Sequence, residues 1–141
     1  AANLVLSSFI PMLMDTGGNS GSQSSTTIIR GLSLGEIRYI DVPRVIFKES
    51  AVAMLCGLTL AVINFGKLML IDHVSMLIAA VVCFTLVVVV LVSNVVGGTL
   101  PILAKRLGFD PTVMASPLIT TIVDAVALII YFNIAKLLLG I

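Results

Sequence analysis

The chain has 141 residues, of which 59% are hydrophobic and 11% charged, and its net charge at pH 7 is +1. A soluble domain carries about 25% charged residues, and a globule of this size could not bury so much apolar side chain, so a water-soluble protein is excluded. The small net charge without a basic cluster also excludes a nucleic-acid binder.

Four stretches are apolar enough to cross the membrane, for which a helix needs about 20 residues. They cover residues 4–29, 51–71, 74–103 and 112–139. The sequence therefore predicts an all-α, polytopic membrane protein, with one domain over residues 1–141 and a bundle of four transmembrane helices.

Local signals refine the ends of these helices. Gly97, Gly98 and Pro101 are expected to kink or end the third helix. Asp110 is expected to be the N-cap of the fourth helix, with Pro111 at its first helical position.

Two weaker polar signals lie near the helices. Glu49 is expected to stabilise the N-terminus of the second helix through the helix dipole. Asn94, in the apolar third helix, is expected to form an interhelical hydrogen bond.

The basic residues predict the orientation. Of the eight Lys and Arg residues, six lie in loops 30–50 and 105–111, whereas Lys67 and Lys136 lie on the opposite side. Because cytoplasmic loops carry an excess of basic residues, these two loops are expected in the cytoplasm and both chain ends outside. The chain is thus expected in the plasma (inner) membrane.

The first stretch carries polar side chains that cannot face lipid. Asp15, Asn19 and Gln23 are four residues apart and share one helix face, beside a face of small residues that includes Gly17 and Gly21. The small residues favour close helix packing. The polar stripe indicates either a water-lined or ion-lined surface or a buried interhelical hydrogen-bond network.

Asp124 lies in the middle of the apolar fourth helix, with Ser116 and Thr120 on the same face. By the helical rise, Asp124 lies about 18 Å from the cytoplasmic start of its helix and Asp15 about 16 Å from the outer start of the first, both near the midplane. An isolated Asp there costs at least about 2.5–3.5 kcal/mol. Asp124 is therefore predicted to be an ion or proton site; the structural alternative is a protonated Asp124 bonded to a backbone carbonyl.

Two motifs carry a family resemblance. The run GGNSGSQ at 17–23, preceded by Pro11, and the runs DPTV at 110–113 and SPLITTIVD at 116–124 resemble the MgtE family of magnesium channels and transporters. Proteins similar to this have five spans, so the resemblance implies that the chain covers spans two to five. The first span and a cytosolic regulatory region, an N-terminal helical domain and a CBS pair, are then expected to be absent.

The resemblance also implies a homodimer with the ion path at the subunit interface, lined by the first and fourth helices. The family's pore aspartate matches Asp124, and Asn19 and Gln23 match the polar segment of its pore helix. Ser116 and Thr120 fall along the cytoplasmic side of the path. Asp15 has no counterpart in the family pattern, so it would add a second carboxylate ring.

The chemistry agrees with a hydrated divalent cation. Magnesium is usually held through one or two carboxylates and retains several waters, and paired Asp124 side chains would neutralise its two charges. Mg²⁺ is thus the expected transported ion and ligand, with no other cofactor. The spacing alone would equally permit manganese, cobalt or calcium.

Other functions were weighed against ion conduction. In a proton- or sodium-coupled secondary transporter, Asp124 would bind the coupling ion. Asp15 and Asp124 could form an aspartic protease dyad, but Asp124 lacks the glycine-rich approach expected there. A purely structural subunit leaves the polar stripe unexplained. The sequence thus favours a transport protein that is not an enzyme.

The expected partners are a second copy, membrane lipid, and the chain's own missing first span and cytosolic domains. By resemblance, those domains sense magnesium and close the pore. Their contact surface is expected over residues 30–49, with Glu36 and Asp41 as candidate contributors to a cytoplasmic metal site.

Overall fold

The computed structural model describes residues 2–114 and 117–140, which form helices and loops with no strand. The predicted all-α class is thus confirmed. The α-helices are α1 (Ala2–Ser7), α2 (Ile10–Ser33), α3 (Val42–Leu70), α4 (Met76–Arg106) and α5 (Pro117–Leu139), and the 3-10 helices are η1 (Tyr39–Asp41) and η2 (Pro111–Met114).

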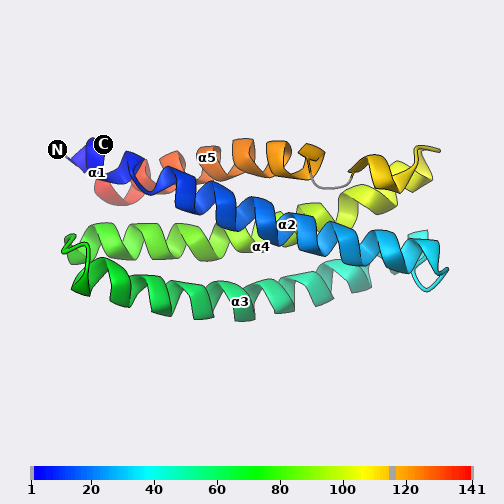
Figure 1. Ribbon diagram of the computed structural model, residues 1–141, viewed down its shortest axis with the longest axis horizontal. Helices are drawn as coiled ribbons and strands as arrows, with labels where there is room; N and C mark the ends of the chain where they lie inside the picture. Colours follow the sequence, from blue (N-terminus) through cyan, green and yellow to red (C-terminus); the bar gives the residue numbers. More distant parts are fainter. Residues whose placement is uncertain (1, 115–116, 141) are drawn as a thin grey trace.

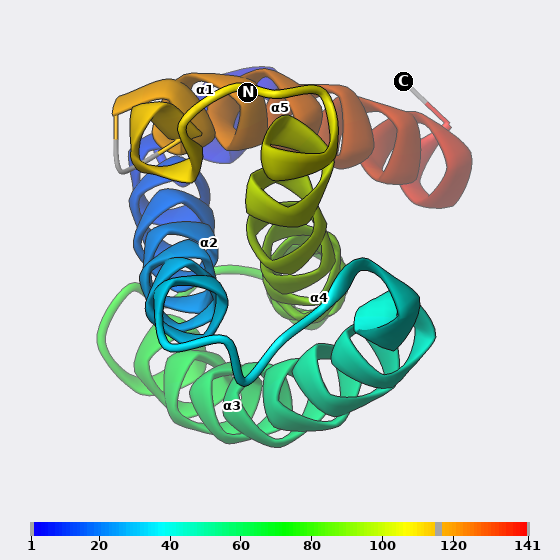
Figure 2. The same ribbon diagram turned by 90° about the vertical axis from the view of Figure 1, so that its right-hand side faces the viewer.

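The four long helices form an antiparallel bundle with α2 and α4 in its middle (Figures 1 and 2). The helix α4 packs along both α2 and α3, and α5 packs mainly against α2. Both chain ends lie at one end of the bundle with the α3–α4 turn, whereas the α2–α3 connection and η2 lie at the other (Figure 1). Loops 30–50 and 105–111 therefore do share one side.

Within residues 2–114 and 117–140, three segments are long and apolar enough to span a membrane: Tyr39–Leu70, Met76–Arg106 and Pro117–Leu139. Their outer faces carry large apolar side chains, such as Leu55 and Val62 on α3 and Ile129 on α5, which are exposed in the protomer. Such a surface suits lipid and not water. The helix α2 is 24 residues long but more polar than these three.

In the structure, the first two helices have bounds that differ from the predicted ones. A turn at residues 8–9 separates α1 from α2, where the predicted first helix was continuous. The helix α3 begins at Val42, nine residues before the prediction, because Val45 packs with Ile28 and Leu32 of α2 and continues the helix beyond the apolar run. Glu49 therefore lies inside α3, and its predicted role at the N-terminus is wrong.

The helix α4 continues through Pro101 to Arg106, so of the two predicted effects of Gly97, Gly98 and Pro101, a kink or an end, the end is wrong. All three residues are buried against neighbouring helices. Tertiary packing offsets the cost of the proline within the helix.

The fourth predicted helix begins later than expected. Asp110 Oδ1 accepts a hydrogen bond from the Thr112 amide at 2.9 Å, but this bond caps η2 and not α5. Since α5 begins at Pro117, Asp124 lies about 10 Å from its first residue by the helical rise, instead of about 18 Å.

Candidate functional site

The helices α2 and α5 approach closely at Gly18. A Cβ atom at Gly18 would be 3.5 Å from Oδ1 of Asp124 and 3.2 Å from Cγ2 of Thr120. At both Gly17 and Gly21, a Cβ atom would be 3.2 Å from a methyl carbon of Val123. The glycine face therefore provides close packing, as predicted, and brings the polar segment of α2 against Asp124.

Asp124 is half-buried, and no hydrogen bond or ion pair to its carboxylate occurs among the described residues. The structural alternative, a bond to a backbone carbonyl, is therefore not formed in the part of the chain that the structure describes. The carboxylate of Asp15 lies near enough to repel that of Asp124. Neither carboxylate has a cationic partner within the described ranges, so the pair forms an electronegative centre to which a cation would be attracted.

Thr120 is half-buried one turn before Asp124, and its hydroxyl donates to the Pro117 carbonyl at 3.0 Å. Ser116, the second hydroxyl predicted on this face, lies outside the described residues.

The polar stripe of α2 faces a cavity of about 580 Å³. Asp15, Asn19 and Gln23 are exposed in the protomer and line this cavity, opposite Val52 and Cys56 of α3. Asp124 is not among the cavity's lining residues. Of the predicted site residues, Asp15, Asn19 and Gln23 therefore line one cavity. Asp15 and Thr120 lie near Asp124.

A hydrogen-bond network lies beside the stripe. The Ser20 hydroxyl donates to Asn94 Oδ1, and the Ser24 hydroxyl donates to the Asn94 carbonyl at 2.9 Å. The predicted interhelical bond of Asn94 is thus confirmed. This network lies on serines beside the stripe, and the water-lined or ion-lined surface expected for Asp15, Asn19 and Gln23 stays a prediction.

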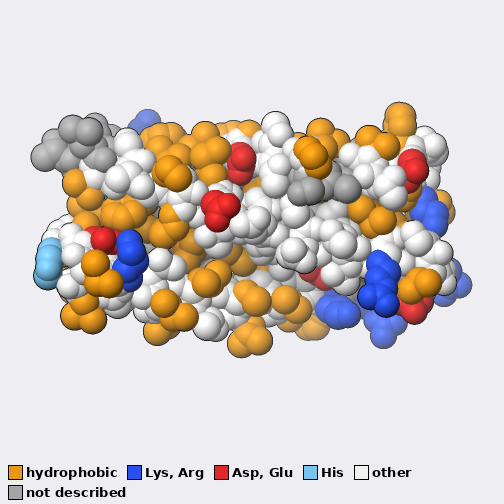
Figure 3. Space-filling model, viewed as in Figure 1, with side chains coloured by type: hydrophobic (Ala, Val, Ile, Leu, Met, Phe, Trp, Pro, Cys, Tyr) orange, Lys and Arg blue, Asp and Glu red, His pale blue; other side chains and the backbone are white. Residues whose placement is uncertain are grey.

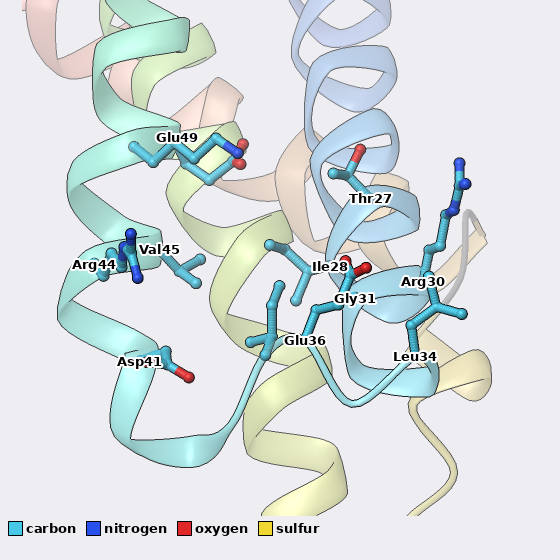
Figure 4. A pocket seen from close by; sticks show the side chains of 12 residues that line it. Thr27, Ile28, Arg30, Gly31, Leu34, Glu36, Asp41, Arg44, Val45 and Glu49 are labelled. Carbon is cyan, nitrogen blue, oxygen red and sulfur yellow. The ribbon is translucent and has the colours of Figure 1, made fainter.

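A second cavity, of about 620 Å³, lies at the end of the bundle that carries the α2–α3 connection (Figure 4). Glu36 and Asp41 line it together with Arg30 and Arg44. Asp41 accepts a hydrogen bond from the Arg38 amide at 2.8 Å. Within residues 2–114 and 117–140, no group of three or more His, Cys, Asp or Glu side chains could hold a metal ion.

Glu49 lines both cavities. The sequence alone did not identify it as a site residue. Its signal is the spacing of the buried residues Val45, Glu49, Ala53 and Gly57, which recur every four residues on one face of α3. A carboxylate in such a stripe faces neighbouring helices and not lipid.

Comparison with known proteins identifies the family. Residues 10–134 match the MgtE family model, described as a divalent cation transporter. The chain is 42% identical over 134 residues to a magnesium transporter MgtE of Thermus thermophilus and 33% identical over 132 residues to one of Bacillus subtilis. These matches cover 95% and 94% of the chain but only 29% of each relative, so the chain spans under a third of their length. The chain therefore belongs to the MgtE family of divalent cation transporters and forms an all-α, multi-pass membrane segment of it.

Proposed function

We propose that this chain is the ion-conducting part of a magnesium transporter, and that Mg²⁺ passes between two copies of it along α2 and α5. The observation that carries the proposal is the Asp124 carboxylate on an apolar helix, beside Gly18, near Asp15 and without a partner among the described residues. An ionisable group at such a position marks an ion path by default. The names of the relatives support magnesium as the ion.

The proposed site holds the ion with its water shell. Two Asp124 carboxylates, one from each protomer, would neutralise the ion's charge, and Thr120 would accept hydrogen bonds from its waters. Magnesium loses water reluctantly and is usually bound through one or two carboxylates. Such a site is favourable to enter and weak enough to leave, as conduction requires.

The helix α2 is proposed to span the membrane beside the three more apolar helices, with its polar stripe facing the cavity toward α3 and away from lipid. On the face in Figure 3, most Lys and Arg side chains lie at one end, and acidic side chains appear in the middle among apolar ones. By the positive-inside rule, that basic end is proposed to face the cytoplasm, with both chain ends outside.

The test is Mg²⁺ uptake into liposomes that contain the full-length protein, wild type against Asp124→Asn. Asparagine keeps the size of the side chain and removes its charge, so uptake is expected to fall at least about tenfold. The matched control is Asp72→Asn, because Asp72 is ion-paired with Lys67 in the α3–α4 turn at one end of the bundle. Unchanged uptake by a folded Asp124→Asn protein would refute the proposal.

The same assay separates conduction from ion-coupled transport. Ionophores that collapse the proton and sodium gradients are expected to leave magnesium uptake unchanged when the membrane potential is held constant. If uptake stops under these conditions, Asp124 binds a coupling ion, and the protein is a secondary transporter.

A further inference from the structure

Glu49 is a buried carboxylate that the proposed ion path does not use. Its exposed fraction is 7%, and it belongs to the inward stripe of α3. Neither a hydrogen bond nor an ion pair to this carboxylate occurs within the described ranges, where the ion pairs are Arg38–Asp41 and Lys67–Asp72. A carboxylate removed from bulk water without a partner is unfavourable unless it is neutralised, hydrated or bound to a cation.

The cavities around Glu49 offer room for a hydrated ion. The cavity between α2, α3 and α4 and the cavity at the loop end share the lining residues Thr27, Lys48 and Glu49. Their volumes, about 580 and 620 Å³, far exceed the roughly 30 Å³ that one water occupies in the liquid. Figure 4 shows the Glu49 side chain extending from α3 into the space toward α2, at about the level of Thr27 along the bundle.

Glu49 of α3 and Ser24 of α2 both approach Gly98 of α4 closely because Gly98 has no side chain. A Cβ atom at Gly98 would be 3.0 Å from Cγ of Glu49 and 3.2 Å from the Ser24 hydroxyl oxygen. Ser24 in turn donates to the Asn94 carbonyl, and the Gln23 amide lines the same cavity. The donor set is one carboxylate with hydroxyl and amide oxygens, which suits a hard cation that keeps most of its water.

We propose that Glu49 anchors a second cation site inside each protomer, separate from Asp124, and that this site takes a hydrated divalent cation. It goes beyond the proposed path at Asp124, because Asp124 does not line this cavity. Lys48 lines both cavities beside Glu49, so its positive charge opposes cation binding. Removing the charge of Lys48 should therefore strengthen cation binding at Glu49.

Cys56 provides a local reporter, since it is exposed and lines the same cavity, whereas Cys83 is buried. The experiment uses the full-length protein in lipid nanodiscs, with Cys56 as its only cysteine. The measured quantities are the rates at which Cys56 reacts with a cationic, an anionic and a neutral thiol reagent, with and without Mg²⁺. Because a cleft with a negative electrostatic potential concentrates cations, the cationic reagent should react at least about tenfold faster than the anionic one.

The proposal expects millimolar Mg²⁺ to slow the cationic reagent. Glu49→Gln should remove this protection and reduce the preference for the cationic reagent, of which Asp15 in the same cavity retains a part. Glu49→Asp, which keeps the charge, should retain the preference, and Lys48→Gln should increase both effects. Asp124→Asn should leave them unchanged, so that failure of the proposed path and failure of this site are distinguishable.

Four results would overturn the proposal. If Cys56 reacts with none of the reagents, lipid or another segment fills the cavity. Protection that survives Glu49→Gln, or that is lost in Asp124→Asn, would assign the ion to another position. Equal slowing of the neutral reagent would mean that magnesium closes the cavity without binding at Glu49.

Discussion

Gly97 on α4 lies directly against the main chain of Gly21 on α2. A Cβ atom at residue 97 would be 2.8 Å from the carbonyl carbon of Gly21 and 3.0 Å from its Cα. Because the obstructing atoms are backbone, no side-chain rotation can relieve this contact. The pair therefore sets the separation of α2 and α4, and with it the position of the polar face of α2.

Gly97→Ala is expected to destabilise the bundle, since overpacking a close contact costs about 1–3 kcal/mol. The measurement is the midpoint of thermal unfolding of the full-length protein in detergent. Gly66→Ala is the matched control, because Gly66 lies in α3 and a Cβ atom there meets nothing within 4 Å. In the control, the helix propensity of alanine should raise stability by up to about 1 kcal/mol. Equal midpoints for the two variants would contradict the packing argument.

Gly18→Ala tests the ion path without removing a charge. The new methyl group would be 3.5 Å from Asp124 Oδ1 and would displace water beside that carboxylate. Magnesium uptake is therefore expected to fall about tenfold, which corresponds to about 1.4 kcal/mol in the barrier. The unfolding midpoint should fall only modestly, because the closest contact, 3.2 Å, is to the side-chain methyl group of Thr120 and not to backbone.

The control for this change is Gly57→Ala. A Cβ atom at Gly57 would be 3.3 Å from Cα of Val87, an equally close helix contact that lies between α3 and α4. Uptake by this variant should stay within about twofold of wild type, because the change is remote from Asp124. If both variants lose uptake equally, packing and not the ion site limits transport.

The sequence predicted the class of fold well because apolar length determines whether a helix can cross a membrane. The helix ends were harder to predict. Residues 42–50 carry Arg44 and Lys48, so they read as a loop, yet Val45 and Glu49 are buried one turn apart and continue α3 inward. Hydropathy does not detect an amphipathic turn that extends a span.

The same limit applies to the site. Asp124 could be identified because a carboxylate in an apolar run is conspicuous, and the Asp15 stripe because its residues recur every four positions. Glu49 lies among charged and polar neighbours, and the separation of α2 from α3 that creates its cavity depends on tertiary packing. That packing includes Gly98, whose missing side chain admits Glu49 and Ser24.

Asp110 is expected to stabilise η2 in a pH-dependent way. The hydrogen bond from the Thr112 amide, with a further contribution from the Thr112 side chain, lowers the pKa of Asp110 below its ordinary value. A lowered pKa in the folded state means that the stabilisation is present above the unfolded-state pKa. It is lost as the pH falls through the lower folded-state pKa.

The measurement for Asp110 is the difference in unfolding midpoint between wild type and Asp110→Asn as a function of pH. Wild type should be the more stable protein at neutral pH. The difference should shrink below about pH 4, as the carboxylate becomes neutral like asparagine. A difference that stays constant down to pH 3 would show that the charge of Asp110 has no part in capping η2.

The last prediction concerns the end of the bundle that carries both chain ends. Tyr131 on α5 is 1% exposed, and its hydroxyl donates to the Leu6 carbonyl at 2.8 Å, which joins α5 to α1. Tyr131→Phe leaves that buried carbonyl without this donor, so the unfolding free energy should fall by about 1–3 kcal/mol. The control is Tyr39→Phe, because the Tyr39 hydroxyl makes an exposed bond of 3.4 Å to the Lys105 carbonyl, and its loss should change stability by less than about 0.5 kcal/mol. If Tyr131→Phe unfolds at the same temperature as wild type and Tyr39→Phe, the bond to Leu6 does not hold α1 against α5.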